Sequence, residues 1–217
     1  MTRHLTTLAA LISGIVGRKS TQWPNVAANI PDGTTPESRV KRFARWLKTD
    51  PSTDEASCVP YAEIVLWHVA LQTRVLVMDG RVVGRGCVAL RLHVVDPGRA
   101  LPLVWQVRQG KQGHCPAARH IALVTQVHKL IPPGAQVVLL GDGACDGTTL
   151  QQTVQEYRWS YGVRTGSNFT VAWDGDSLRC ATVGACLKPG TLVAFKDARV
   201  TDEAYGPILL LGCWAQG

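Results

Sequence analysis

Two aspartates, Asp79 and Asp142, each follow a short apolar run, Val-Leu-Val-Met in the first case and Val-Val-Leu-Leu-Gly in the second. Such runs are typical of buried β-strands, so each carboxylate is expected at a strand end, where the sheet fixes its backbone. If the two strands are neighbours, the carboxylates converge on one point. Converging carboxylates repel each other unless a cation lies between them, and their hard oxygen atoms suit Mg²⁺ or Mn²⁺.

Carboxylates arranged in this way could support phosphodiester chemistry. Two metal ions about 3.5–4 Å apart can hold a scissile phosphate, activate a water or 3′-hydroxyl, and stabilise the leaving oxygen. Such chemistry usually needs at least a third carboxylate. The alternative is that Asp79 and Asp142 only cap turns between strands and loops, and spacing alone leaves both interpretations open.

The residues after Asp142 fit no other common binding loop. A calcium loop is excluded because Ala144 occupies a ligand position and Thr153 stands where a bidentate glutamate belongs. No lysine follows the glycines, as a nucleotide-binding P-loop requires. Asp146 could orient the loop or contribute directly, and the sequence does not decide between these roles.

A looser cluster surrounds a predicted helix over 117–131, and it consists of His114, Cys115, His120 and His128. Zinc binding is conceivable for these residue types, but solvated or packed side chains are the default interpretation. The seven cysteines are odd in number and none has C-x-x-C spacing, so reduced thiols in a cytosolic protein are expected.

The charge distribution favours a polyanionic partner such as nucleic acid. The chain carries 23 basic and 16 acidic residues, a net charge of +7. A predicted helix after Pro36 concentrates much of this charge. Candidate phosphate contacts are Arg39, Lys41, Arg42, Arg45 and Lys48, with Lys111 in a later basic loop. The alternative is that these side chains form an ordinary solvated surface.

The first seventy residues are predicted to be a helical, basic, DNA-binding region. Apolar residues at helical spacing predict a helix over 3–16, and Pro24 could open a short second helix. Thr35 and Pro36 signal a helix start, with Thr as the cap. Another helix is expected over 60–71. No run approaches the ~18 apolar residues of a membrane span, and a cytoplasmic protein is expected.

The pattern then changes to strands alternating with helices. Strands are predicted at 74–78, 87–95, 101–107, 137–140 and 160–164, with helices over 117–131 and 148–157. This β-β-β-α-β-α-β order predicts a ribonuclease H-like α/β fold, a mixed sheet with flanking helices. Residues 71–165 would form this partial catalytic core. Residues 166–217 read as the start of a β-rich insertion, without a helix signal.

Several stretches resemble the DDE transposases of bacterial insertion sequences, in the IS-four type group with a Y-R-E signature. The matching segments are S-R-V-K-R-F-A-R-W-L-K, D-G-R-V-V-G-R-G, G-R-A-L-P-L-V-W-Q-V-R-Q-G-K-Q-G-H, P-P-G-A-Q-V-V-L-L-G-D-G-A-C-D-G and Y-G-P-I-L-L-L-G-C-W. They run through most of the chain in family order. One segment alone would be weak support, whereas the ordered set is specific.

The resemblance implies DNA binding followed by metal-dependent cleavage and strand transfer of phosphodiester bonds, with two Mg²⁺ or Mn²⁺ ions. It implies Asp79 and Asp142 as the first two catalytic and metal-binding acids. The implied partners are the element's terminal inverted repeats, target DNA and a second copy of the protein in a synaptic complex.

The third family acid, a glutamate within a Y-x-x-R-x-x-x-E pattern, does not occur after Asp142. Glu156 and Glu203 stand in a different context. We therefore expect a catalytically impaired transposase, encoded by a frameshifted or prematurely terminated element. The alternatives are a DNA-binding fragment that competes with the full-length transposase, or a structure-specific nuclease.

Overall fold

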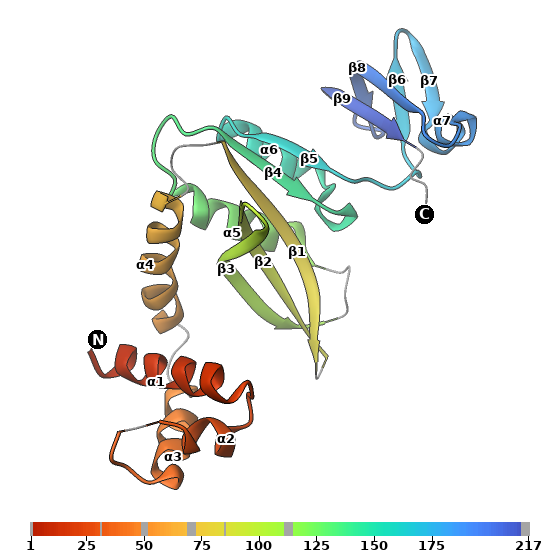
Figure 1. Ribbon diagram of the computed structural model, residues 1–217. Coiled ribbons are helices and arrows are strands. Elements are labelled where there is room, and N and C mark those ends of the chain that lie inside the picture. The colour runs from red at the N-terminus through yellow and green to blue at the C-terminus, as the bar shows by residue number, and fades with distance from the viewer. Residues whose placement is uncertain are drawn as a thin grey trace. The chain divides into compact units, whose positions relative to one another are not determined.

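A computed structural model describes residues 2–30, 32–48, 52–68, 73–84, 86–110 and 115–213 (Figure 1). The chain divides into two compact units, Met1–Ala62 and Glu63–Gly217. The boundary falls within a helix that continues from one unit into the other. No helix in the described parts of the chain has both the length and the apolar composition needed to cross a membrane.

The first unit is helical, as the sequence predicts. Its helices are α1 (Thr2–Arg18), α2 (Trp23–Ala28), α3 (Pro36–Trp46) and the first part of α4 (Ser52–His68). The cap of α3 is confirmed, since the Thr35 hydroxyl accepts a hydrogen bond from the Ser38 amide at 3.3 Å. The expected start of α4 at residue 60 is wrong, because Pro60 lies inside the helix.

A small core holds α1, α2 and α3 together. Its buried residues are Val26, Ala27, Ile30 and Phe43, and Trp23 packs on the Phe43 ring. The predicted apolar face of α1 is only partly buried. Ala10, Leu11 and Ile15 contact the core, whereas the side chains exposed on α1 include Leu5, Ile12 and Val16. The shorter helices α2 and α3 cover only part of the apolar surface of α1.

The second unit contains a five-stranded mixed sheet. Its strands are β1 (Arg74–Gly84), β2 (Cys87–Asp96), β3 (Arg99–Gln109), β4 (Val137–Gly141) and β5 (Ser160–Val163). The spatial order is β3-β2-β1-β4-β5. The β1–β2 and β2–β3 pairs are antiparallel, and the β1–β4 and β4–β5 pairs are parallel. This arrangement confirms the predicted ribonuclease H-like fold class.

Strand β1 is longer than the sequence predicts, and this changes the position of Asp79. We expected the strand to end at Asp79, but hydrogen bonding to β2 continues to Gly84. The prediction was wrong because the second half of β1 is exposed and lacks the apolar run that marks the first half. Asp79 therefore lies in the middle of a long hairpin strand.

Two helices follow the sheet strands, α5 (Ala117–His128) and α6 (Thr148–Glu156). Helix α5 packs on β2, β3 and α6. Its buried face consists of His120, Leu123, Val124 and Val127, at the spacing of one helix face. The expected inward positions Ile121 and Leu130 are only partly buried. The buried face of α5 is thus rotated about the helix axis relative to the predicted face, and it includes His120.

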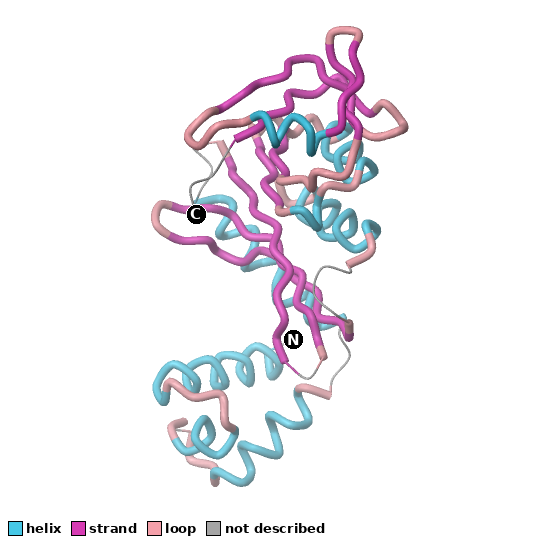
Figure 2. Tube along the Cα trace, turned by 90° about the vertical axis from the view of Figure 1, so that its right-hand side faces the viewer, coloured by secondary structure: helices cyan, strands magenta, loops and turns pink. Residues whose placement is uncertain are grey.

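A second sheet follows, with strands β6 (Thr170–Trp173), β7 (Asp176–Arg179), β8 (Leu192–Val200) and β9 (Tyr205–Cys213) in the order β7-β6-β8-β9. Figure 2 traces the strands of both sheets in magenta. The predicted β-rich character of this region is present. The expectation that it lacks a helix is wrong, because α7 (Cys180–Cys186) connects β7 to β8. A seven-residue segment without buried residues leaves little periodic signal.

Candidate metal and nucleic-acid site

The two candidate acids come from neighbouring parallel strands. In the β1–β4 pair, Arg74 lies opposite Val137, and the last paired residues are Met78 and Gly141. Asp79 directly follows Met78, and Asp142 directly follows Gly141, so the backbones of the two aspartates lie at the same level of the sheet. Neighbouring parallel strands were the condition under which the two carboxylates could act together.

The carboxylate of Asp79 is held by a cross-strand ion pair. Asp79 lies opposite Arg91 in the β1–β2 hairpin, and Arg91 Nη2 donates to Asp79 Oδ2 at 2.8 Å. The Asp79 side chain is 49% exposed. On the same face, His93 lies opposite Val77. Burial, reinforced by the positive charge of Arg91, lowers the pKa of His93, so its imidazole adds little positive charge near Asp79 at neutral pH.

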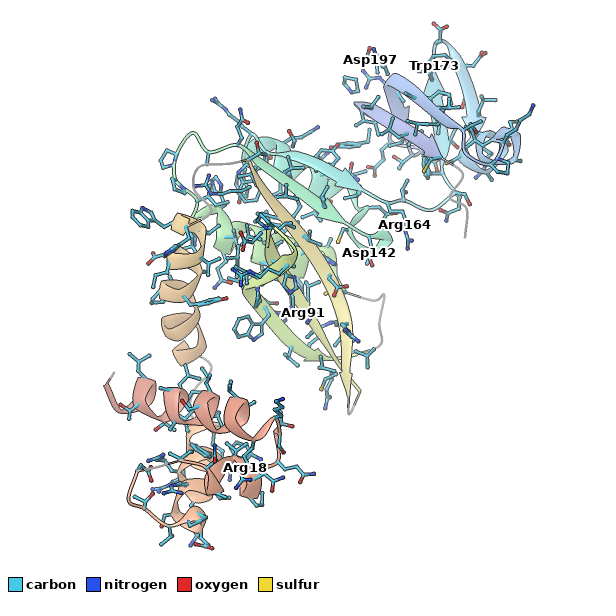
Figure 3. All side chains as sticks on the ribbon, viewed as in Figure 1. Arg18, Arg91, Asp142, Arg164, Trp173 and Asp197 are labelled. Carbon is cyan, nitrogen blue, oxygen red and sulfur yellow. The ribbon has the colours of Figure 1, made fainter. Side chains whose placement is uncertain are left out.

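Asp142 instead caps the turn that follows β4. Its Oδ1 accepts a hydrogen bond from the Ala144 amide at 3.0 Å, which starts the 3-10 turn η1 (Gly143–Cys145). The Asp142 carbonyl accepts from the Cys145 amide at 2.9 Å. Figure 3 shows Asp142 at the end of β4, in the same region as Arg164, which follows β5. The turn-capping role considered for Asp142 is therefore real, and it also fixes the position of the carboxylate.

The side chains of Asp79 and Asp142 have different surroundings. Met78 and Leu92 are paired and buried. Because successive side chains on a strand point to opposite faces, Asp79 and Arg91 lie on the other face. The two acids are therefore neighbours in the backbone register, but their carboxylates have different partners.

A cavity of about 340 Å³ adjoins Asp142. It is lined by Gly80, Val88, Leu90, Cys115, His120, Asp142, Gly143, Ala144, Cys145 and Arg164. Asp79 is not among the described lining residues. The cavity thus combines an apolar wall from β2 with a carboxylate, an imidazole and a guanidinium.

Two residues beside Asp142 have clear structural roles. Burial, followed by the negative charge of Asp142, raises the pKa of the Cys145 thiol to about 12, so this thiol stays protonated at neutral pH. Asp146 Oδ2 accepts a hydrogen bond from the Thr165 hydroxyl, and its carbonyl accepts from the buried Gln151 amide. Asp146 therefore orients the loop, which is one of the two roles considered for it.

The donor set of the two acids fits a hard divalent cation, because both offer carboxylate oxygens. Among the described residues, no group of three or more His, Cys, Asp or Glu side chains is arranged to hold a metal ion. Asp79 and Asp142 are thus two suitable ligands from adjacent strands, and they do not form a complete two-metal set.

The loose histidine and cysteine cluster does not form a zinc site in the described structure. Cys115 and His120 line the cavity, but His128 stacks on Tyr157 with ring centroids 3.8 Å apart. His114 lies outside the described residues. Packing is therefore the role of His128.

The basic helix α3 contains two arginines that neutralise an acid within their own unit. Arg39 is buried, donates to Asp32 Oδ1 at 2.6 Å, and also donates to the Ala27 carbonyl at 2.8 Å. Arg42 pairs with Asp32 Oδ2 at 2.9 Å. Both arginines were candidate DNA contacts. Arg39 cannot present its guanidinium to a phosphate without leaving these partners, so we assign it to folding.

The remaining candidates, on α3 and in the turn after it, share one exposed surface. Lys41, Ala44, Arg45 and Lys48 line a shallow depression of about 310 Å³. Lys41 and Lys48 are exposed. Arg45 donates to the Lys41 carbonyl at 3.4 Å. Lys111, the last candidate, lies outside the described residues.

Sequence reasoning named His120 only in the loose histidine and cysteine cluster, and it missed Arg91 and Arg164 as members of the candidate site. His120 had a usable signal, because it shares helical spacing with Leu123, Val124 and Val127 and is the polar residue on that apolar face. Arg91 and Arg164 had no such signal. Their proximity to the acids depends on strand register and on the return of β5 to the sheet.

No protein-family model matches the sequence, and no curated protein sequence matches it. Among solved structures, the chain is similar to the Mos1 transposase catalytic domain with raltegravir and Mg, at 11% identity and a TM-score of 0.31. That similarity covers 48% of this chain and 57% of that chain. A second Mos1 mariner catalytic domain gives 10% identity, a TM-score of 0.31, and coverage of 48% and 56%.

A third solved structure is an Aquifex aeolicus member of the Ppx/GppA family. It has 15% identity and a TM-score of 0.22, and the similarity covers 44% of this chain and 36% of that chain. This chain therefore spans little more than half the length of the two Mos1 domains and less of the third protein. Because these TM-scores are low, the fold assignment rests on the strand order described above.

Proposed function

We propose that this protein is a transposase-type enzyme that binds DNA and acts on its phosphodiester bonds with a divalent metal ion. The observation that carries the proposal is the β1–β4 register, in which Asp79 and Asp142 follow the paired residues Met78 and Gly141. In a ribonuclease H-like sheet, this is the place where two strands can present acids to one phosphate. The resemblance to insertion-sequence transposases supports the same two residues.

Asp79 and Asp142 would hold the metal ion, Mg²⁺ or Mn²⁺. When bound, such an ion stabilises the negative charge that develops on the phosphate. The chain's own residues supply position and charge. The cap at Ala144 fixes Asp142, Arg91 orients Asp79, and Arg164 offers a positive charge beside Asp142.

We further propose that catalysis by this polypeptide is impaired, because a family member would use a third carboxylate. Glu156 ends α6, and Glu203 lies in the turn between β8 and β9. Neither belongs to a metal-holding group in the described structure. Cleavage is therefore best measured with enzyme in excess over DNA, where a single slow turnover is visible.

The first prediction concerns the two acids. Asp79→Asn and Asp142→Asn should each lower Mg²⁺- or Mn²⁺-dependent nicking of duplex DNA at least about a hundredfold, because each removes a charged ligand. Mn²⁺ binding followed by electron paramagnetic resonance should weaken in the same variants. Asp174→Asn is the matched control, since Asp174 lies in the exposed β6–β7 turn and should retain wild-type nicking.

DNA binding without cleavage is the second candidate function, favoured by the exposed Lys41, Arg45 and Lys48 surface. The chain would then occupy element ends and compete with a full-length transposase. Gel-shift binding to terminal inverted-repeat DNA without any metal-dependent nicking would select this function.

Nicking confined to branched or flapped DNA would instead indicate a structure-specific nuclease. A dimer that bridges two DNA ends, seen by sedimentation, would support assembly into a synaptic complex.

A further inference from the structure

Helix α1 is apolar on two opposite sides, and its own unit uses only one of them. The inner side packs on α2 and α3 (Figure 1). Thr7 and Gly14 are buried there, and Leu11 and Ile15 contact the small core. Because an α-helix has about 3.6 residues per turn, these four positions fall on one side of α1 and leave the opposite side without a contact to that core.

The opposite side carries a continuous apolar stripe, which consists of Leu5, Ala9, Ile12 and Val16. The exposed fractions are 46% for Leu5, 52% for Ile12 and 69% for Val16. The sequence from Leu5 to Val16 contains no charged residue, so no charge interrupts the stripe. Single exposed apolar residues are common on protein surfaces, whereas an aligned set on one helix face indicates a surface that another element covers.

The spacing within the stripe indicates which kind of element covers it. Its successive members are four, three and four residues apart, which is the spacing of a and d positions in a coiled coil. Such a seam fits a second helix that crosses at a shallow angle and carries a similar seam. DNA is a poor partner for this face, because the stripe has no basic side chain to pair with phosphates.

A second copy of this chain presents the same seam, and charge decides the direction in which two copies pair. Arg18 lies in the last turn of α1, and Lys19 directly follows it. A parallel pair would bring these cations of both copies together, whereas an antiparallel pair separates them and aligns the helix dipoles favourably. Antiparallel pairing also sets the small Ala9 against the larger Ile12 of the other copy, so the side chains interdigitate.

We propose that α1 is a dimerisation surface of this protein, on which the apolar stripe packs antiparallel against the same stripe of a second copy. Both copies use the same residues, so the contact is isologous and closes after two chains. The dimer joins two first units, and each keeps its own surface of Lys41, Arg45 and Lys48. The inference goes beyond the proposed enzymatic function and does not depend on it.

The length of the stripe sets the expected strength of the dimer. At 1.5 Å per residue, the distance along the helix from Leu5 to Val16 is roughly 17 Å. A seam of this length buries well under the ~800 Å² per partner of a standard stable interface. We therefore expect a weak dimer, with a dissociation constant of about 10–100 µM.

Sedimentation velocity of the full chain, without DNA or metal, measures this dimer between about 1 µM and about 500 µM. Ile12→Asp should raise the dissociation constant at least about a hundredfold, because one substitution places a carboxylate at two positions of the symmetric seam. Ser13→Asp is the matched control, since Ser13 is exposed on α1 beside the stripe. This control should keep the wild-type constant, and circular dichroism checks that both variants keep their helical content.

A charge-swap experiment tests the direction of pairing. Ala9→Lys should weaken self-association, but its equimolar mixture with Ile12→Asp should form a heterodimer tighter than either variant alone. The introduced ammonium then faces the introduced carboxylate across the antiparallel seam. A mixture of Ile12→Asp with Ile12→Lys should recover less, because these positions face each other only in a parallel pair. The reverse ranking of the two mixtures contradicts the antiparallel arrangement.

Two results would overturn the proposed surface itself. One is a chain that stays monomeric up to about 500 µM. The other is a dimer that Ile12→Asp and Ser13→Asp affect equally. Neither result bears on the enzymatic proposal, because sedimentation needs no cleavage and the tests of Asp79 and Asp142 measure nicking and Mn²⁺ binding. The two proposals can therefore fail separately.

Discussion

At the scale of single residues, the basic helix illustrates how charge in a sequence can be misread. Asp32 is the common partner of Arg39 and Arg42. Hydrogen bonds from Thr34 and then from Arg39 are the main causes that hold the pKa of Asp32 well below its usual range. An arginine counted as a phosphate contact thus stabilises the fold of the first unit.

This arrangement predicts a pH-dependent stability of the first unit. Because the folded-state pKa of Asp32 is lowered, its contribution is present above the unfolded value of about 3.9 and is lost as the pH falls through the folded value. Asp32→Asn should therefore reduce amide hydrogen-exchange protection in α3 at pH 6, and the difference from wild type should shrink in acid. Glu37→Gln, which changes the exposed acid of the same helix, should leave protection nearly unchanged.

At the scale of elements, the turn after β4 depends on one close approach. A Cβ added to Gly141 would lie 2.5 Å from the Cys145 Cβ and 2.9 Å from its Sγ. Glycine at this position therefore allows η1 to fold back against the strand end and hold Asp142 there. The sequence predicted the strand and the loop, but it could not show that this glycine is required by a contact four residues later.

Gly141→Ala should accordingly lower the free energy of unfolding by about 1–3 kcal/mol, the usual cost of overpacking. Urea unfolding measures this loss. Gly147→Ala should cost less, because a Cβ added there meets nothing within 4 Å. Adding Cys145→Gly to Gly141→Ala should recover part of the loss, and failure of this rescue would contradict the contact as its cause.

At the scale of the whole molecule, the two units carry different parts of the proposed function. The first carries the exposed Lys41 of α3 and Lys48 in the turn after it, and the second carries the candidate acids and the cavity. Phosphate binding by lysines releases counterions from DNA, so affinity should fall steeply with salt. A flat salt response would remove the basic helix from the proposed DNA interface.

The double variant Lys41→Ala, Lys48→Ala tests this division of function. The slope of log affinity against log salt should decrease by about two, because each lysine that contacts a phosphate contributes close to one. Fluorescence anisotropy with duplex DNA at several salt concentrations measures the slope. Lys188→Ala, which changes a lysine of the second unit, should leave the slope unaltered.

The sequence by itself determined the order and type of the main elements. Apolar runs, helical spacing and helix-start residues such as Thr35 and Pro36 are local signals, and they predicted the ribonuclease H-like core and the helical first unit. The ends of helices and strands were predicted less accurately where a segment is exposed, as in the second half of β1, and the exposed helix α7 was not predicted. These segments are specified by pairing or connection to distant residues and leave no periodic pattern.

Only the tertiary structure decided which side chains meet. The register of β1 with β2 pairs Asp79 with Arg91, and the packing of α5 places His120 in the cavity beside Asp142. The ion pair with Asp32 holds the Arg39 guanidinium away from the candidate DNA surface. Each of these contacts joins residues whose closeness depends on strand register or helix packing, and neither quantity is encoded in the local spacing of residue types.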